Sequence, residues 1–278
     1  MSDLLRLAVS NIAWDAAEDE TVAALLRVEG VSAIEVAPTK WRERPLKASP
    51  REIAEYRARW QDLGLEIVAL QALLFGRPDL QLFGDTRRAL ADYLRGTIDL
   101  GVALGARAFV FGSPKNRLRG SMSEVDATGI AVDFFREMGD HASAHGAVLC
   151  IEANPPEYGC DFITTTAEAV TLCTVINNLG IGVNGDLGGM TIDGEDPRAT
   201  IESAAGVLAH FHASEPQLVE LGAEADHDSA SAGLASIAYP GWVSIEMKSG
   251  GSPSNVESVG RAVRLAKAWY GPPIGPNG

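Results

Sequence analysis

The chain is short of cysteine and of long apolar runs, and each shortage excludes a class of protein. Its 278 residues include only three cysteines, and these form no C-x-x-C motif. Such usage favours a reducing cytoplasm over a disulfide framework. No apolar segment approaches the roughly 18 residues that a membrane span needs, so we expect a cytoplasmic protein without a membrane partner.

Basic residues are also scarce. The chain has 23 Lys and Arg against 37 Asp and Glu, a formal net charge of −14. Binding to a phosphate backbone needs a basic surface that releases counterions, so nucleic acid is excluded as a partner. The length is enough to bury a core without disulfides or a structural metal, either as one large α/β barrel or as two modest domains.

Glycines punctuate the chain at regular joints between a helical pattern and a strand-like run. These joints are Gly30, Gly64, Gly105, Gly146, Gly180, Gly206 and Gly241. A left-handed C-cap at the end of a helix favours a residue without a Cβ atom. With a first strand over 5–12, the repeat gives about eight β/α units and no linker between them. We therefore predict one (β/α)₈ TIM barrel over 1–270 and a flexible C-terminal tail over 271–278.

The same pattern gives approximate element boundaries. Besides the strands that follow Gly146, Gly180, Gly206 and Gly241, strands are predicted over 33–37, 66–70 and 108–111. Helices are predicted over 19–28, 50–63, 86–104, 165–179, 197–205, 229–238 and 256–269, with one more between Ser123 and Gly146.

Polar residues end the predicted strands. In a TIM barrel the active site lies at the carboxyl ends of the parallel strands, and residues five to seven positions beyond each glycine meet there. These residues are Glu35, Gln71, Glu152, Asp186, His212 and Glu246. Glu152, Asp186, His212 and Glu246 form a hard, mostly oxygen ligand set that suits Mn²⁺, Mg²⁺ or Co²⁺, with Zn²⁺ as a further candidate. The alternative is that each acid pairs separately with an Arg or Lys.

Further polar residues accompany this set. Asn184, His210 and Ser244 lie two positions earlier on their strands and should support the ligands from below. His141 and His145 have the i, i+4 spacing of a ligand pair. They also end a helix, where imidazole interacts favourably with the helix dipole, and we interpret them that way.

The C-terminal half carries four short motifs: Ile151-Glu152, Gly185-Asp186, His212-Ala-Ser-Glu215 and Tyr239-Pro-Gly-Trp-Val-Ser-Ile-Glu246. They resemble the xylose isomerase-like TIM barrels, which include sugar and sugar-phosphate isomerases and epimerases, inosose isomerase and dehydratase, and endonuclease IV. The resemblance implies that Glu152, Asp186, His212 and Glu246 hold one divalent metal ion. It also implies that Glu152 and Glu246 are the catalytic acid/base groups.

The resemblance also suggests substrate-binding residues. Trp14 ends a Ser10-Asn-Ile-Ala-Trp14 run, where an aromatic residue of the family often lines the pocket; a core position is the alternative. His227 falls where many relatives have a histidine before the last helix. Gln71 and Asn154, at or just beyond strand ends, complete the uncharged candidates.

The chain departs from the family in three respects. Ketose 3-epimerases carry a histidine at the position of Gly189 and an arginine at that of Leu218, which argues against simple ketohexose 3-epimerisation. Endonuclease IV needs additional histidines where this chain has Gln71, Gly112 and Gly189. Together with the acidic charge, that departure argues against a nuclease.

The few basic side chains gather just beyond predicted strand ends: Lys40, Arg77, Lys115, Arg117 and Lys248. They are either solvated loop charges or a positive patch for an anionic substrate, which would bind through Lys115, Arg117 or Lys248.

We expect a divalent-metal-dependent isomerase or epimerase of a sugar, sugar phosphate or cyclitol, in which Glu152 or Glu246 moves a proton next to a carbonyl. The alternatives are a dehydratase of an inosose-like keto-polyol on the same site and a non-catalytic barrel that binds a sugar or a partner. Homo-oligomerisation is left open.

Overall fold

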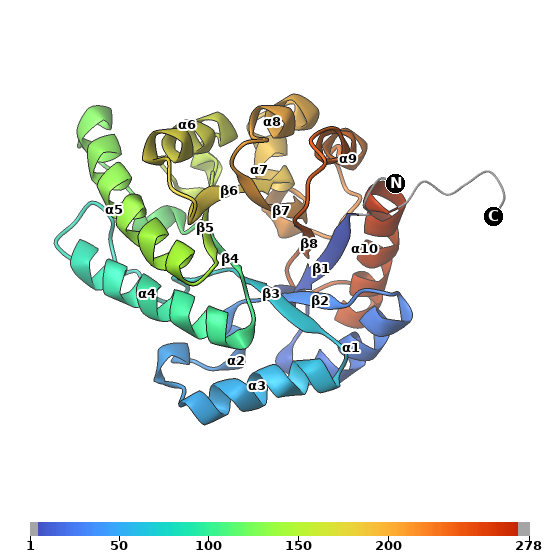
Figure 1. Cartoon of the computed structure of the whole chain (residues 1–278). Helices are drawn as coiled ribbons and strands as arrows, with labels where there is room; N and C mark the ends of the chain where they lie inside the picture. Colours follow the sequence, from blue (N-terminus) through green and yellow to red (C-terminus); the bar gives the residue numbers. More distant parts are fainter. Residues whose placement is uncertain (1–4, 272–278) are drawn as a thin grey trace.

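A closed barrel of parallel strands forms the centre of the molecule (Figure 1). The computed structural model describes residues 5–271, and eight strands lie within them. In chain order they are β1 (Arg6–Ser10), β2 (Ala33–Val36), β3 (Glu66–Leu70), β4 (Ala108–Phe111), β5 (Val148–Glu152), β6 (Ile181–Asp186), β7 (Leu208–Ser214) and β8 (Trp242–Glu246). Each strand pairs with the next and β8 pairs with β1, which confirms the predicted (β/α)₈ fold.

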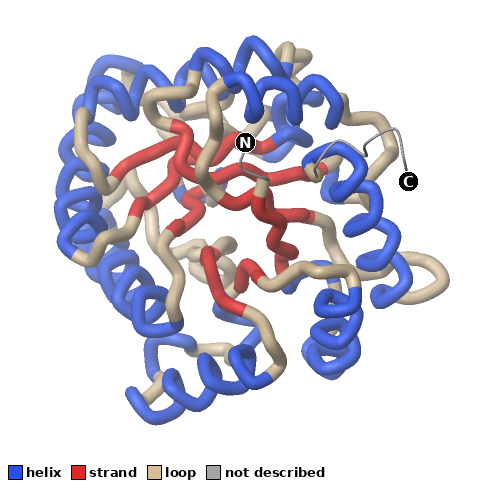
Figure 2. Tube along the Cα trace, turned by 45° about the vertical axis from the view of Figure 1, so that its right-hand side comes forward, coloured by secondary structure: helices blue, strands red, loops and turns tan. Residues whose placement is uncertain are grey.

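Helices surround the barrel and cover the outer face of its strands (Figure 2). They are α1 (Asp19–Val28), α2 (Pro38–Trp41), α3 (Pro50–Asp62), α4 (Arg87–Leu104), α5 (Glu124–Ala144), α6 (Thr166–Ile176), α7 (Leu187–Ile192), α8 (Pro197–Ser203), α9 (His227–Ser236) and α10 (Asn255–Tyr270). The short α2 and α7 were not predicted. Short 3-10 helices occupy several loops: Asn11–Ala13, Ala16–Glu18, Pro45–Lys47, Pro114–Asn116, Pro156–Tyr158 and Pro216–Leu218.

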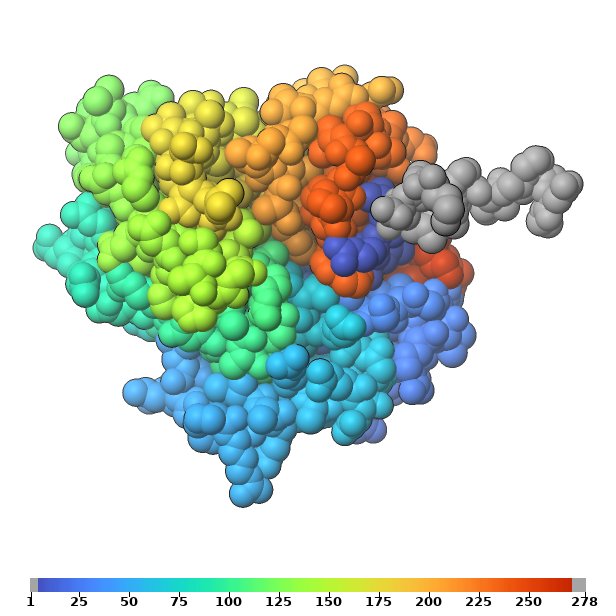
Figure 3. Space-filling view, viewed as in Figure 1, coloured from blue at the N-terminus to red at the C-terminus, as the bar shows by residue number. Residues whose placement is uncertain are grey.

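The ends of the barrel meet as the closed topology requires. Figure 3 shows the first segments, in blue, directly beside the last ones, in orange and red. The predicted tail over 271–278 lies, apart from Gly271, outside the described residues, as do residues 1–4 of the predicted domain. Among the described residues, no helix combines the length and the apolar character that crossing a bilayer requires.

Only some of the seven glycine joints adopt the left-handed backbone conformation. Gly30, Gly64, Gly105 and Gly146 have positive φ angles, as the prediction of left-handed caps requires. The prediction is wrong for Gly180, Gly206 and Gly241. Near two of these, Asn177 and Ala238 adopt the left-handed conformation instead, with φ of 47° and 50°.

Apolar side chains on the outward faces of the strands pack against the helices. Val9, Ile34, Phe109 and Phe211 are fully buried there. Phe111 of β4 meets Phe135 of α5 edge to face, with ring centroids 5.3 Å apart. This shell of core residues leaves the inward positions near the carboxyl ends of the strands to polar groups.

The register of the strands brings those polar groups to one level. The aligned pairs are Glu152 with Asn184, Asp186 with His212, and Ser214 with Glu246. Parallel pairing therefore places residues from β5 to β8 around one point at the carboxyl end of the barrel.

Candidate metal and active site

A cavity of about 340 Å³ opens at the carboxyl ends of the strands. Six of the residues predicted from the sequence line it: Gln71, Glu152, Asn154, Asp186, Glu246 and Lys248. His212 lies directly beneath, with its side chain fully buried. The residues of the predicted metal site thus come together in one place.

The His212 imidazole separates two groups of carboxylates. Its Nδ1 atom lies 3.1 Å from Glu246 Oε2, 3.5 Å from Glu152 Oε2 and 3.8 Å from Asp186 Oδ2. Its Nε2 atom lies 3.1 Å and 3.2 Å from the two oxygens of Glu35. Glu35 accepts the Nε2 proton. Burial lowers the pKa of His212, but the Glu246 and Glu35 carboxylates raise it well above its usual value, so a cation that binds at Nδ1 displaces a proton there.

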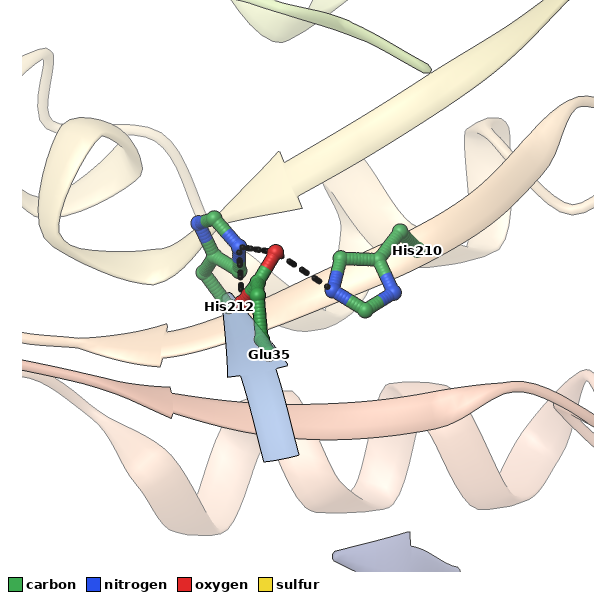
Figure 4. A group of neighbouring side chains, drawn as sticks. All are labelled: Glu35, His210 and His212. Atoms are coloured by element: carbon green, nitrogen blue, oxygen red, sulfur yellow. Dashed lines mark hydrogen bonds and ion pairs between the residues drawn. The ribbon is translucent and has the colours of Figure 1, made fainter. Parts of the chain in front are cut away.

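Glu35 is a fully buried carboxylate on β2 that lies beside the imidazoles of His210 and His212 (Figure 4). Ser244 Oγ donates to it at 2.6 Å, and His210 Nε2 lies 3.4 Å away. Burial would raise the pKa of Glu35, but the His212 and His210 imidazoles lower it well below its usual range. Glu35 is therefore ionised and fixes the orientation of His212. The sequence placed Glu35 at the strand ends without assigning it this role.

Amide groups hold the Glu152 carboxylate from two sides. Asn184 Nδ2 donates to Oε2 at 2.8 Å, and Asn154 Nδ2 donates to Oε1 at 2.8 Å. Burial and the neighbouring Asp186 carboxylate raise the pKa of Glu152 to about 7. Asn184, His210 and Ser244 thus lie below the cavity, as their strand positions predicted.

Asp186 both faces the cavity and caps a helix. Ser214 Oγ donates to its Oδ2 at 2.7 Å, and the backbone amide of Gly189 in α7 donates to its Oδ1 at 2.6 Å. Burial and the Glu246 carboxylate raise the pKa of Asp186 to about 6. A Cβ atom at Gly189 would stand 3.0 Å from Asp186 Oδ1, so a side chain at this position would crowd the Asp186 carboxylate.

This donor set fits a hard divalent cation. Ligand atoms of Asp186, His212 and Glu246 lie within 4.8 Å of one another, and Glu152 Oε2 is 3.5 Å from His212 Nδ1. Burial and the charges of the neighbouring carboxylates raise the pKa values of Glu152 and Asp186, so the three carboxylates at this place repel each other. A divalent ion with oxygen and imidazole preference relieves that repulsion.

Two predicted substrate contacts are corrected by the structure. Trp14 is fully buried in the core, where its Nε1 donates to Asp19 Oδ1 at 2.9 Å, so it does not line the cavity. His227 is also buried, because its ring stacks on Trp269 at a centroid distance of 4.2 Å. Its Nε2 lies 3.1 Å from Glu215 Oε1, so it supports a loop instead of touching substrate.

The predicted positive patch is reduced to one residue. Lys248 lines the cavity, whereas Lys40, Arg77, Lys115 and Arg117 are not among the described residues that do. Lys115 is exposed on the loop after β4. Arg117 is fully buried and donates to the backbone oxygens of Glu152 at 2.8 Å and Ile163 at 3.2 Å. The guanidinium thus supports the end of β5 and is not available to an anion.

Several cavity residues were not predicted as site residues from the sequence. Ala72, Ser113, Gln217 and Leu218 line the cavity with φ angles between 47° and 60°. Residues without glycine's freedom adopt this conformation only where their surroundings impose it, and such strain gathers at functional sites. Tyr158 also lines the cavity, and its hydroxyl accepts a hydrogen bond from the backbone N–H of Gln217 at 2.9 Å.

Comparison with known proteins agrees with this architecture. Residues 23–269 match the xylose isomerase-like TIM barrel family, and the chain belongs to that family. The predicted resemblance is thereby confirmed. A comparison with curated proteins found no significant match.

Solved structures with the same fold include sugar epimerases. A D-psicose 3-epimerase in the presence of D-fructose is 18% identical, with a TM-score of 0.80 over 96% of this chain and 100% of that one. The 3-keto-D-glucoside 4-epimerase of E. coli is 16% identical, with a TM-score of 0.74 over 94% and 99%. An IolI protein with a bound zinc atom is 16% identical, with a TM-score of 0.72 over 95% and 96%.

Proposed function

We propose that this protein is a divalent-metal-dependent isomerase or epimerase of a sugar, sugar phosphate or cyclitol. The observation that carries the proposal is the convergence of Glu152, Asp186 and Glu246 on His212 Nδ1 at the floor of a cavity. The similarity in fold to epimerases and to a zinc-containing IolI protein supports the same reading.

Glu152, Asp186, His212 and Glu246 would hold one ion, with Mn²⁺, Mg²⁺ or Co²⁺ favoured by the mostly oxygen donor set. When bound, such an ion acts as a Lewis acid toward substrate oxygens. Glu35 would keep His212 in the tautomer that presents Nδ1, because it accepts the Nε2 proton.

The proton transfer is assigned to Glu152 and Glu246. They come from β5 and β8, and both line the cavity, so a substrate between them contacts two carboxylates. One glutamate would take the proton from the carbon next to the carbonyl, and a proton would then be returned. Return to the opposite face of the same carbon gives an epimer, whereas return to the neighbouring carbon gives an isomer.

The cavity also carries groups suited to a polyhydroxylated substrate. Asn154 Oδ1 is buried and has no hydrogen-bond partner among the described residues, so it can accept a bond from a substrate hydroxyl. Gln71 Nε2 donates to Ser10 Oγ at 2.7 Å, which fixes its amide at the cavity wall. Lys248 supplies a positive charge for a phosphate or carboxylate group.

The deciding experiment is turnover in heavy water with candidate ketoses, ketose phosphates and inososes. We expect deuterium on the carbon next to the carbonyl, with exchange that depends on added metal. Metal-reloaded Glu246→Gln should still bind substrate but lose at least about 10²-fold in exchange and conversion.

Other outcomes would contradict the proposal in distinct ways. An unlabelled product would indicate a hydride shift, and a product lighter by one water would indicate a dehydratase. A fully metal-loaded protein that neither exchanges nor converts any candidate would favour a binding protein.

The anionic-substrate part has its own test. Lys248→Met should raise KM for a phosphorylated substrate about tenfold or more, while the KM of its neutral counterpart changes little. Equal turnover of neutral and phosphorylated sugars by the unchanged protein would argue against a role for Lys248 in anion binding.

A further inference from the structure

We propose that Asp99, His141 and His145 form a second divalent transition-metal site, of the kind that binds Zn²⁺, on the outer surface between α4 and α5. Asp99 comes from α4, whereas His141 lies in the last turn of α5 and His145 follows directly after it. The site lies on helices outside the barrel and does not depend on the proposed catalytic function.

The two histidine side chains already converge on one carboxylate oxygen of Asp99. His141 Nε2 lies 2.7 Å from Asp99 Oδ1, and His145 Nε2 lies 3.7 Å from the same atom. The sequence showed only the i, i+4 histidine pair at a helix end. The structure adds a third ligand, the Asp99 carboxylate of the neighbouring helix, which lies 42 residues before His141 in the sequence.

A backbone hydrogen bond sets the tautomer of His145. Its Nδ1 lies 2.9 Å from the backbone oxygen of His141 and donates its proton there. The neutral ring therefore carries its lone pair on Nε2, the nitrogen that faces the Asp99 carboxylate. A lone pair opposite a carboxylate oxygen is unfavourable unless a proton or a metal cation lies between them. Fixing one ring nitrogen by a hydrogen bond is also the way in which proteins prepare histidine ligands.

The spacing suits a small transition-metal ion. One ligand atom from each residue lies within 4.8 Å of the other two. Tetrahedral bonds of about 2.1 Å place ligand atoms about 3.4 Å apart, so modest side-chain rotations complete the site. Side-chain exposures of 23% for His141, 39% for His145 and 55% for Asp99 allow those rotations and leave room for water as a fourth ligand.

The donor set also selects the kind of ion. Two imidazoles and one carboxylate are typical of Zn²⁺, whereas Mg²⁺ and Ca²⁺ prefer oxygen ligands throughout. An ion bound here would join α4 to α5, next to the Arg95–Glu137 ion pair that already links these helices. Because the ligands converge only in the folded chain, binding would raise the unfolding temperature.

The test is zinc titration of the chelator-treated, full-length protein by calorimetry. His145→Gln and Asp99→Asn should each remove the same zinc equivalent per chain, or weaken it at least ~10-fold, the lower limit for disturbing a metal ligand's surroundings. Asp92→Asn, an exposed acid on the same helix, is the matched control and should retain that equivalent. Magnesium binding should be the same in all four proteins.

Unfolding curves provide a second measurement. In chelator, His145→Gln should unfold at the wild-type temperature, and added zinc should then raise that temperature less than in the wild type. Equal zinc stoichiometry and affinity in wild type and His145→Gln would overturn the proposal. Loss of the same equivalent in Asp92→Asn would overturn it as well, since the binding would then follow surface charge instead of these three ligands.

Discussion

Glu215 holds the loop between β7 and α9 by accepting hydrogen bonds on both carboxylate oxygens. The donors are the consecutive backbone amides of residues 222–225, at 2.7 to 3.1 Å. Burial would raise the pKa of Glu215, but His227 and these amides lower it to about 2. The acidic residue three positions after the proposed metal ligand His212 thus fixes the loop that follows β7.

Glu215→Gln should destabilise the protein by about 2–3 kcal/mol near neutral pH, because an amide nitrogen would face two of the four donors. The folded-state pKa lies below the unfolded value of roughly 4.3, so the stabilisation is present above that value and is lost as the pH falls toward 2. Urea unfolding at pH 7 and at pH 3 measures the difference, which should shrink at the lower pH. A constant difference would contradict this account.

Glu35→Gln should weaken Mn²⁺ binding roughly 10- to 100-fold, the usual effect of removing the partner of a metal-bound histidine. The Gln amide cannot hold the His212 Nε2 proton as the carboxylate does. Glu66→Gln is the matched control, since Glu66 is exposed at the start of the neighbouring β3. Calorimetric titration of both variants with Mn²⁺ decides the matter, and equal affinities would rule out a role for Glu35 in orienting His212.

At the scale of elements, two glycine joints look alike in sequence but differ in structure. A Cβ atom on Gly180 would overlap the backbone of α5 at Gly139, whereas one on Gly206 would meet nothing within 4 Å. Gly180→Ala should therefore cost about 1–3 kcal/mol, as overpacking does. Gly206→Ala should stay within about 0.5 kcal/mol of wild type. Denaturant midpoints of the two variants test this, and equal midpoints would refute the close approach of β6 to α5.

Element order was predictable because a glycine or turn residue separates each helical pattern from the strand after it. The short α7 was not, since Leu187-Gly-Gly-Met-Thr-Ile192 contains two glycines, which disfavour a helix. It forms because the Asp186 side chain caps its first turn. Contacts set by the tertiary fold override local preference here.

At the scale of the whole molecule, the strand-end rule identified the proposed ligands without any contact information. It could not assign Glu35, because the bond between Glu35 and His212 joins residues 177 positions apart. It also could not tell a loop cation that points into the cavity, Lys248, from one that supports the backbone, Arg117. Strand position fixes the level of a side chain, whereas loop residues follow paths that periodicity does not encode.

Removal of the metal should destabilise the entire barrel. A ligand at 100 times its Kd adds about 2.7 kcal/mol, so Mn²⁺ should raise the unfolding temperature of the chelator-treated protein by about 5 °C or more. Asp186→Asn is the informative variant, because Asn still caps α7 but removes one of the clustered charges. It should unfold at a higher temperature than metal-free wild type and gain little from Mn²⁺. The same Mn²⁺-induced rise in both proteins would contradict the proposed ligand set.

The Glu215 loop has a consequence for how freely this part of the chain can vary. Residues 222–225 contact Glu215 only through their backbone amides, and the side chains of Ala223 and Glu224 are exposed. Gly222 has a φ of 95° and is restricted to glycine-like conformations, and Ala225 packs against the core, but the exposed Ala223 and Glu224 contribute only an N–H group to this contact. In a saturation library, residues 223 and 224 should accept most amino acids and reject proline, which has no amide proton to give.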